Sequence, residues 1–282
     1  MNKLNCFKEI NYRLWIMTGI IYLSMTHSVV QINAQPKLSN IEVFDIVKSL
    51  PTSQETYLLL KQQKRTFNQK LSRHIKKIKP QQVTSSDLVA MNLGVMSSKV
   101  LYAEMYGKRE DARNALAKMK ILMDSLRVET ISSFKSLYEY INKSKDLDYL
   151  VFRTGAFIEQ IKDYCFKRGR TKQLVLICSG DWTESMYLML SETINKPQVN
   201  LKHRVLEQDI IIEQLVYMYQ DFVESEVMVL VKKEMDNIST LIKAAKFVKD
   251  DGELEYAKLS KRKLRKILRS IKRIRFKIMH IR

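Results

Sequence analysis

Residues that interrupt helices are scarce in this chain. Its 282 residues include only 7 Gly and 4 Pro. The prolines fall between periodic segments rather than inside them, at positions 36, 51, 80 and 197. The segments between them are rich in Leu, Met, Lys, Glu and Ala, which favour helix, whereas Gly and Pro disfavour a helix interior by about 1 and about 3 kcal/mol. The sequence therefore predicts an all-α fold, a single-domain helical bundle of about nine or ten mostly antiparallel helices.

Capping residues and apolar spacing place these helices along the chain. The patterns at 52–55 and 84–87 are typical of helix starts, and the second helix is expected to reach Met105. Gly107 is expected to cap that helix in the left-handed conformation, so that the next helix returns as a hairpin. Further helices are predicted at 130–142, 147–167, 171–193, 199–222 and 223–249, and a turn at 250–252.

Cysteine and histidine are also rare, with 3 Cys and 4 His. Cys165 and Cys178 could form a disulfide or lie buried as two small apolar side chains, and neither has the Cys-x-x-Cys spacing of a zinc or redox site. The histidines lack metal-site spacing, and there is no Gly-rich phosphate loop, nucleophile elbow or His-Glu-x-x-His motif. The sequence therefore predicts no catalytic residue, no cofactor and no metal.

The first 34 residues have the pattern of an export signal. Lys3, Lys8 and Arg13 precede an apolar stretch at 14–25, and Ala34 supplies a small residue before a cleavage site. The apolar stretch is shorter than the roughly 20 residues of a membrane span. No Cys follows it at which a lipid could be attached. We therefore expect a cleaved signal peptide at 1–34 and a periplasmic or secreted protein, with an uncleaved inner-membrane anchor as the alternative.

Acidic residues are missing from the C-terminal segment. After Glu255 there are twelve Lys and Arg and no Asp or Glu, in a chain of net charge +19. The sequence therefore predicts a basic amphipathic helix at 256–282, after a helical domain at 35–255. Its apolar stripe contains Leu264, Leu268, Met279 and four isoleucines between them, whereas Lys261, Arg275 and Phe276 break the pattern.

Three roles are open to this basic helix. It could dock its stripe on the bundle, lie on an anionic membrane surface, or bind a nucleic acid or another polyanion. Export disfavours nucleic acid, which leaves a lipid surface, an envelope polyanion or another envelope protein as partner. The candidate contact residues are the cations opposite the stripe: Lys266, Arg269, Lys272, Arg273 and Lys277.

Three glycines lie inside predicted helices, which indicates close approach of another helix. They are Gly94, Gly155 and Gly180. The last two begin the same pattern, Gly-x-aromatic-x-Glu, which suggests an internal helix-hairpin repeat. One interpretation makes Glu159, Asp181, Trp182 and Glu184 the lining of a ligand groove. The other places Trp182 and Phe157 in the core and pairs the glutamates with lysines.

Three stretches carry a resemblance to a known family. They are residues 49–52, residues 90–95 leading to Tyr102 and Tyr106, and residues 180–187. In these stretches the chain resembles an uncharacterised family of exported all-helical bacterial proteins, many of them predicted lipoproteins, with no assigned activity. The resemblance implies an all-helical domain behind a signal peptide and transfers no catalytic residue. The chain departs from the family in lacking a lipidation Cys.

These observations together favour a non-enzymatic binding or structural protein of the bacterial cell envelope. One alternative is a peripheral membrane protein attached through the basic C-terminal helix. Another is a helical-repeat scaffold for protein–protein interaction, although the chain lacks the regular 34-residue period of tetratricopeptide repeats.

Overall fold

The computed structural model describes residues 38–72, 79–128, 131–143, 146–222, 224–248, 254–255 and 259–279. The expected signal peptide at 1–34 lies outside these residues, as does the expected turn at 250–252. Leu38–Arg282 forms one compact unit. The predicted all-α class is confirmed, with one short pair of strands added.

In the described residues twelve helical elements precede the pair of strands and the C-terminal helix. Most of the predicted helix bounds fall close to the observed ones. The first seven are α2 Asn40–Ser49, α3 Ser53–Gln62, α4 Gln69–Ser72, the 3-10 turn η2 Pro80–Gln82, α5 Ser86–Met105, α6 Arg109–Ser125 and α7 Ile131–Lys143. The others are α8 Leu147–Lys167, α9 Thr171–Asn195, α10 Val199–Leu206, α11 Gln208–Tyr219, α12 Glu226–Lys243, β1 Phe247–Val248, β2 Leu254–Glu255 and α13 Lys261–Met279.

Local signals account for several of these boundaries. At the start of α3 the backbone amide of Thr52 donates to Glu55 Oε1 at 3.2 Å, as expected of a capping pair. Gly107 has φ +66° and ends α5, so that α6 returns against it as predicted. Asp146 caps α8 by accepting from the amide of Tyr149 at 3.0 Å.

Two of the predicted helices differ from the structure. The stretch 199–222 is not one helix, because it breaks at Glu207 between α10 and α11. At the break the side-chain amide of Gln208 donates to the backbone carbonyl oxygen of Arg204 at 3.0 Å. In an uninterrupted helix that oxygen accepts from the backbone amide of Gln208, so the side chain competes with the helical hydrogen bond. The predicted helix at 223–249 ends at Lys243, and the chain then pairs Phe247 with Glu255 in a short antiparallel ladder.

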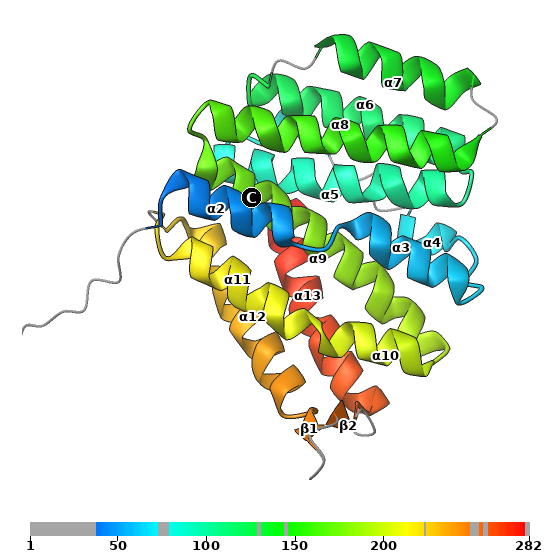
Figure 1. The fold of residues 1–282 in the computed structure, drawn as a ribbon, viewed down its shortest axis with the longest axis vertical. Coiled ribbons are helices and arrows are strands. Elements are labelled where there is room, and N and C mark those ends of the chain that lie inside the picture. Colours follow the sequence, from blue (N-terminus) through cyan, green and yellow to red (C-terminus); the bar gives the residue numbers. More distant parts are fainter. Residues whose placement is uncertain are drawn as a thin grey trace, which may run out of the picture. The chain divides into compact units, whose positions relative to one another are not determined.

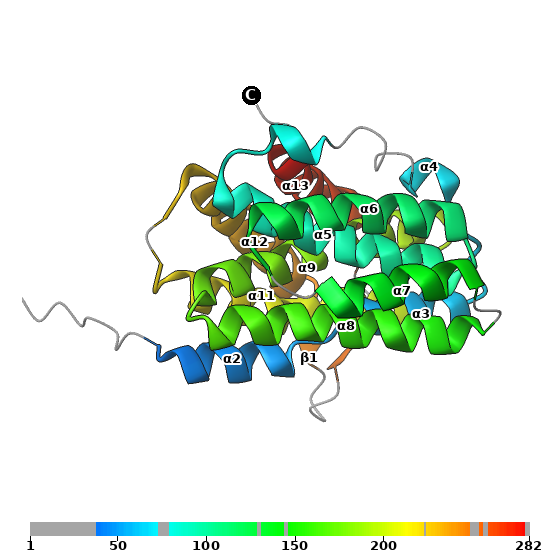
Figure 2. The ribbon, with the colours of Figure 1, turned by 90° about the horizontal axis from the view of Figure 1, so that it is seen from above.

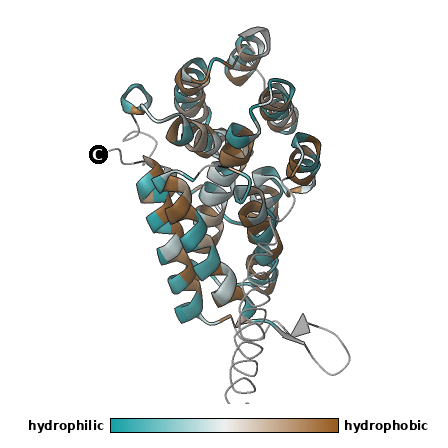
Figure 3. Ribbon diagram, turned by 90° about the vertical axis from the view of Figure 1, so that its left-hand side faces the viewer, coloured by the Kyte–Doolittle hydropathy of each residue, from teal (hydrophilic) through white to brown (hydrophobic). Residues whose placement is uncertain are grey.

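Helices α5 and α9 form the centre of the fold. Figure 1 shows α5 to α8 roughly side by side, α10 to α13 as a second group, and α9 running between the two groups. Figure 2 shows the first group from above, with α6 and α8 along α5. Nearly every residue of α5 and α9 is buried, as expected of helices that are apolar or small on all sides. In Figure 3 the surrounding helices carry hydrophilic and hydrophobic residues on different sides.

The two central helices touch at two glycines. A Cβ atom on Gly94 would clash with the carbonyl oxygen of Ile177, and one on Gly180 would clash with the carbonyl oxygen of Met91. The expectation of close backbone approach is therefore confirmed at both positions, and they belong to the same crossing. It is wrong for Gly155, where a Cβ would meet only the side-chain oxygen of Gln54, at 2.9 Å.

The basic helix α13 packs on the bundle through its apolar stripe. Leu264, Ile267, Ile271, Ile274 and Ile278 are fully or almost fully buried, and α13 contacts α9, α12 and α5. The backbone carbonyl of Ile278 accepts from Asn92 Nδ2 of α5 at 2.7 Å. The stripe is therefore covered by protein.

A buried ion cluster also holds α13 in place. Arg275 Nε lies 2.6 Å from Glu184 Oε2 of α9, and Lys99 Nζ of α5 lies 2.8 Å from Glu184 Oε1. Arg275, which breaks the apolar pattern of the sequence, lies on the buried side of the helix, and its side chain lies over the ring of Tyr187. Burial acts to raise the pKa of Glu184, but Arg275 and Lys99 outweigh it and lower that pKa to about 2.

The glycine contact gives the first prediction. Gly94→Ala and Gly180→Ala should each lower the free energy of unfolding by on the order of 1–3 kcal/mol, because a methyl group would force the backbones apart. Gly155→Ala is the matched control. It also lies inside a helix but meets only a flexible side chain, so the gain in helix propensity should leave it neutral or slightly stabilising. Urea denaturation measures the free energy of unfolding of all three variants. Equal losses of stability would contradict the assignment of Gly94 and Gly180 to the contact between α5 and α9.

The second prediction concerns the docking of α13. Arg275→Met removes a partner from a fully buried carboxylate and should lower the free energy of unfolding by roughly 3–5 kcal/mol. Lys277→Met is the control, since Lys277 lies on the same helix and pairs with Glu226, whose side chain is 93% exposed. Loss of that pair should lower stability by less than about 1 kcal/mol. A small effect of Arg275→Met in thermal or urea unfolding would show that the cluster does not hold the helix.

Candidate functional site

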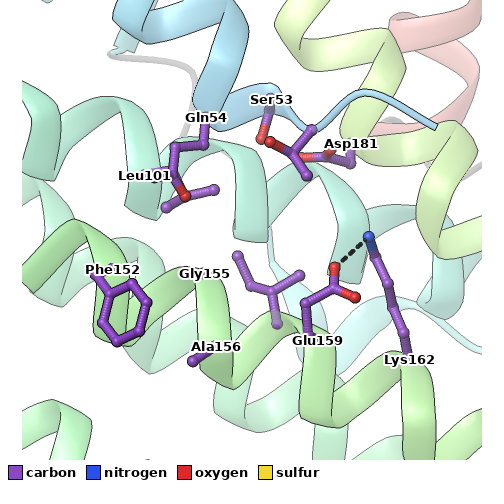
Figure 4. A pocket seen from close by; sticks show the side chains of 11 residues that line it. Ser53, Gln54, Leu101, Phe152, Gly155, Ala156, Glu159, Lys162 and Asp181 are labelled. Carbon is purple, nitrogen blue, oxygen red and sulfur yellow. Dashed lines mark hydrogen bonds and ion pairs between the residues drawn. The ribbon is translucent and has the colours of Figure 1, made fainter. Parts of the chain in front are cut away.

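A pocket of about 300 Å³ lies between α3, α5, α8 and α9, and we call it the α3–α8 pocket. Figure 4 shows its lining side chains. From α3 and the residue before it come Thr52, Ser53 and Gln54, from α5 Leu101, from α8 Phe152, Gly155, Ala156, Ile158, Glu159 and Lys162, and from α9 Asp181.

One face of α8 supplies most of the wall. Phe152, Gly155, Ala156 and Glu159 recur at three- and four-residue spacing, so they lie along the same side of the helix. The small residues in the middle leave space that a larger side chain would fill. Phe152 is 65% exposed at one end of this row, so the pocket has an apolar wall that ends in an aromatic ring.

The other end of the wall is charged. Glu159 Oε2 lies 2.6 Å from Lys48 Nζ, and Glu159 Oε1 lies 2.7 Å from Lys162 Nζ. Burial acts to raise the pKa of Glu159, but Lys162 and Lys48 outweigh it and lower that pKa. Burial acts to lower the pKa of Lys162, and the opposing charges around it, including those of Glu159 and Asp181, raise it overall. Glu159 and its two lysines are therefore ionised and paired.

Asp181 lies across the pocket from this ion pair, beside Ser53 at the N-terminus of α3 (Figure 4). Burial raises the pKa of Asp181, and the charge of Lys162 opposes the rise without cancelling it. Its Oδ1 atom has no hydrogen-bond partner, and neither has the hydroxyl of Ser53. Ser53 is only 2% exposed. The pocket thus contains two buried oxygen atoms whose hydrogen-bonding capacity is unused.

The four residues of the predicted groove do not all meet. Glu159 and Asp181 line the same pocket, although they come from different helices. Trp182 is 6% exposed and donates from Nε1 to Gln208 Oε1 at 3.0 Å, toward α11. Glu184 lies one turn beyond Asp181 and is enclosed by Lys99 and Arg275. Phe157 is buried in the core.

Sequence reasoning missed several lining residues. Lys162 follows Glu159 by three residues, so helical spacing could have found it. Phe152 could have been found in the same way. Ser53 and Gln54 could not, because α3 reaches the pocket only through tertiary packing.

The basic face of α13 is a second candidate surface. Lys266, Arg269 and Lys272 are exposed on it. The remaining two predicted contact residues are engaged, Arg273 with Glu234 at 3.0 Å and Lys277 with Glu226 at 3.6 Å. The face therefore offers cations to a partner while the opposite side of the helix is buried.

Cys165 and Cys178 form no disulfide, and both are buried. Burial raises the pKa of each thiol, Cys165 and Cys178, to about 11, so both are protonated at neutral pH. Within the described residues no group of His, Cys, Asp and Glu could hold a metal ion. None of the helices described is both long enough and apolar enough to span a membrane.

The chain was also compared with known proteins. No protein-family model, no curated protein and no solved structure matches it.

Proposed function

We propose that the protein is an exported, non-enzymatic binding protein of the bacterial cell envelope that takes a small ligand in the α3–α8 pocket. The observation that carries this proposal is the unpartnered Asp181 Oδ1 in a pocket with an apolar wall. Ligand sites typically combine such a wall with a few polar groups that orient the ligand. At about 300 Å³ the pocket suits a small molecule.

Two further features support this proposal. The basic and apolar pattern of residues 1–34 is typical of an export signal, and the chain resembles exported helical proteins in the stretches 90–95 and 180–187. The charged groups of the lining are two carboxylates and one lysine, with Glu159 and Lys162 already paired. Such groups hold and orient a ligand by charge and hydrogen bonding.

Peripheral attachment to an anionic lipid surface is a second candidate function. It is favoured by Lys266, Arg269 and Lys272, which are exposed along one face of α13. Because the apolar stripe of this helix is buried against α9 and α12, the contact would be electrostatic and would not insert the helix into the lipid. Lys and Arg near an anionic membrane surface contribute about 1 kcal/mol each.

The pocket is tested with 1-aminoanthracene, an apolar fluorophore whose emission rises when it leaves water. We expect saturable binding of one fluorophore per chain. Gly155→Trp places a large ring in the pocket and should weaken binding at least about tenfold, a loss of about 1.4 kcal/mol. Lys167→Trp adds the same ring at an exposed position of α8 and should leave binding unchanged. If a folded Gly155→Trp protein, checked by circular dichroism, binds as the wild type does, the pocket is not the site.

Membrane attachment is tested by sedimentation with vesicles that contain phosphatidylglycerol. The triple variant Lys266→Glu, Arg269→Glu, Lys272→Glu should lose most of its binding at low salt, and the wild type should lose it at high salt because screening weakens exposed charges. The control reverses three exposed lysines elsewhere, Lys70→Glu, Lys143→Glu and Lys167→Glu, with the same change in net charge. Equal losses in both triple variants would show a net-charge effect and rule out a dedicated surface on α13.

A further inference from the structure

The charged groups in and beside the α3–α8 pocket include more carboxylates than cations. Two cations, Lys48 and Lys162, lie among three carboxylates, Glu159, Asp163 and Asp181. Lys48 pairs with Glu159 at 2.6 Å and with Asp163 at 2.9 Å, and Lys162 pairs with Glu159 at 2.7 Å. When all five are ionised, the group carries one excess negative charge.

The excess charge lies at Asp181. Within the described residues its carboxylate forms no ion pair, whereas Glu159 pairs with two lysines and Asp163 pairs with one. One of its oxygens has no hydrogen-bond donor, and the Ser53 hydroxyl beside it is also unpartnered. A carboxylate removed from water is strongly destabilised unless it is paired. A cation brought by a ligand would supply the missing partner.

The chemistry of the surrounding atoms narrows the kind of cation. A primary ammonium group is compact and has three N–H donors, and both Asp181 Oδ1 and the Ser53 hydroxyl oxygen can accept from it. An anionic ligand would instead meet Asp181 and Glu159, while the nearest cations are already paired. Beyond the charged end, Leu101, Ala156 and Phe152 present an apolar surface to the rest of the ligand (Figure 4).

We propose that the α3–α8 pocket binds a primary amine that carries a small apolar group, with its ammonium against Asp181 and Ser53 and its apolar part against Phe152 and Leu101. This inference rests on the proposed function, because it assigns a ligand class to the same site. It goes beyond the proposed function because it requires the ligand to carry a positive charge at one end and an apolar group at the other.

The test compares three ligands of one length, n-hexylamine, 1-hexanol and hexanoate, by isothermal titration calorimetry on the wild-type protein. Hexylamine should bind at least about tenfold more tightly than hexanol, since a hydrogen bond to a charged group contributes about 1.5–3 kcal/mol. Hexanoate should bind most weakly. Asp181→Asn keeps the shape of the side chain and removes its charge, so hexylamine should lose its advantage over hexanol.

Asp163→Asn is the matched control, because it removes one carboxylate from the same charged group but does not line the pocket. It should keep the preference for hexylamine. If Asp181→Asn does not fold, the order of the three ligands on the wild type and on Asp163→Asn decides the question. Binding of 1-aminoanthracene without a preference for hexylamine would overturn the ligand class and leave the binding site standing. Absence of binding by all four compounds would overturn both.

Discussion

The contact between α5 and α9 is the constraint on which the rest of this structure depends. Gly94 and Gly180 let the two backbones touch, and side chains larger than hydrogen would separate them. Helices α3, α6, α8, α11 and α13 pack against this pair. The residues that follow Gly180 take their positions from the same contact, because Asp181 enters the α3–α8 pocket and Glu184, one turn later, receives Arg275 from α13. The motif stretches 90–95 and 180–187 both lie at this crossing, so its geometry gives a physical reason for their small residues.

The buried cluster of Lys99, Glu184 and Arg275 divides the basic helix into two faces with different roles. Arg275, a residue that is only 5% exposed, joins a stripe of isoleucines on one side of α13. The bidentate contact of its guanidinium group with Glu184 replaces the hydrogen bonds to water that the group loses. The other side keeps Lys266, Arg269 and Lys272 in solvent. The many cations of α13 therefore do not prevent it from packing on the bundle. Among its described residues only Arg275 is a buried cation, and Glu184 neutralises it.

Glu159 and Asp181 show how environment separates two carboxylates that the sequence presents alike. Glu159 follows the helical Gly155 by four residues, Asp181 directly follows the helical Gly180, and both carboxylates line one pocket. Glu159 is held by two lysines, which lower its pKa, whereas burial raises the pKa of Asp181. Glu159 contributes to stability through its ion pairs with the two lysines. Asp181 has an oxygen atom, Oδ1, without a hydrogen-bond partner, which is the property of a group that binds a ligand.

The sequence by itself determined the helices and their order. Sparse Gly and Pro, capping residues and helical spacing placed α5, α8 and α9 almost to the residue, because these signals act between neighbours in the chain. They failed at Glu207 and after Lys243, where a side-chain bond and a short strand pair replaced helix. Only the tertiary structure decided that Gly94 meets Ile177, that Gly180 meets Met91, and that Arg275 is buried. It alone also decided that Ser53 and Asp181 line one pocket and that Trp182 and Glu184 do not line it. Those outcomes depend on which helices pack together, and residue spacing along one helix carries no information about its partner.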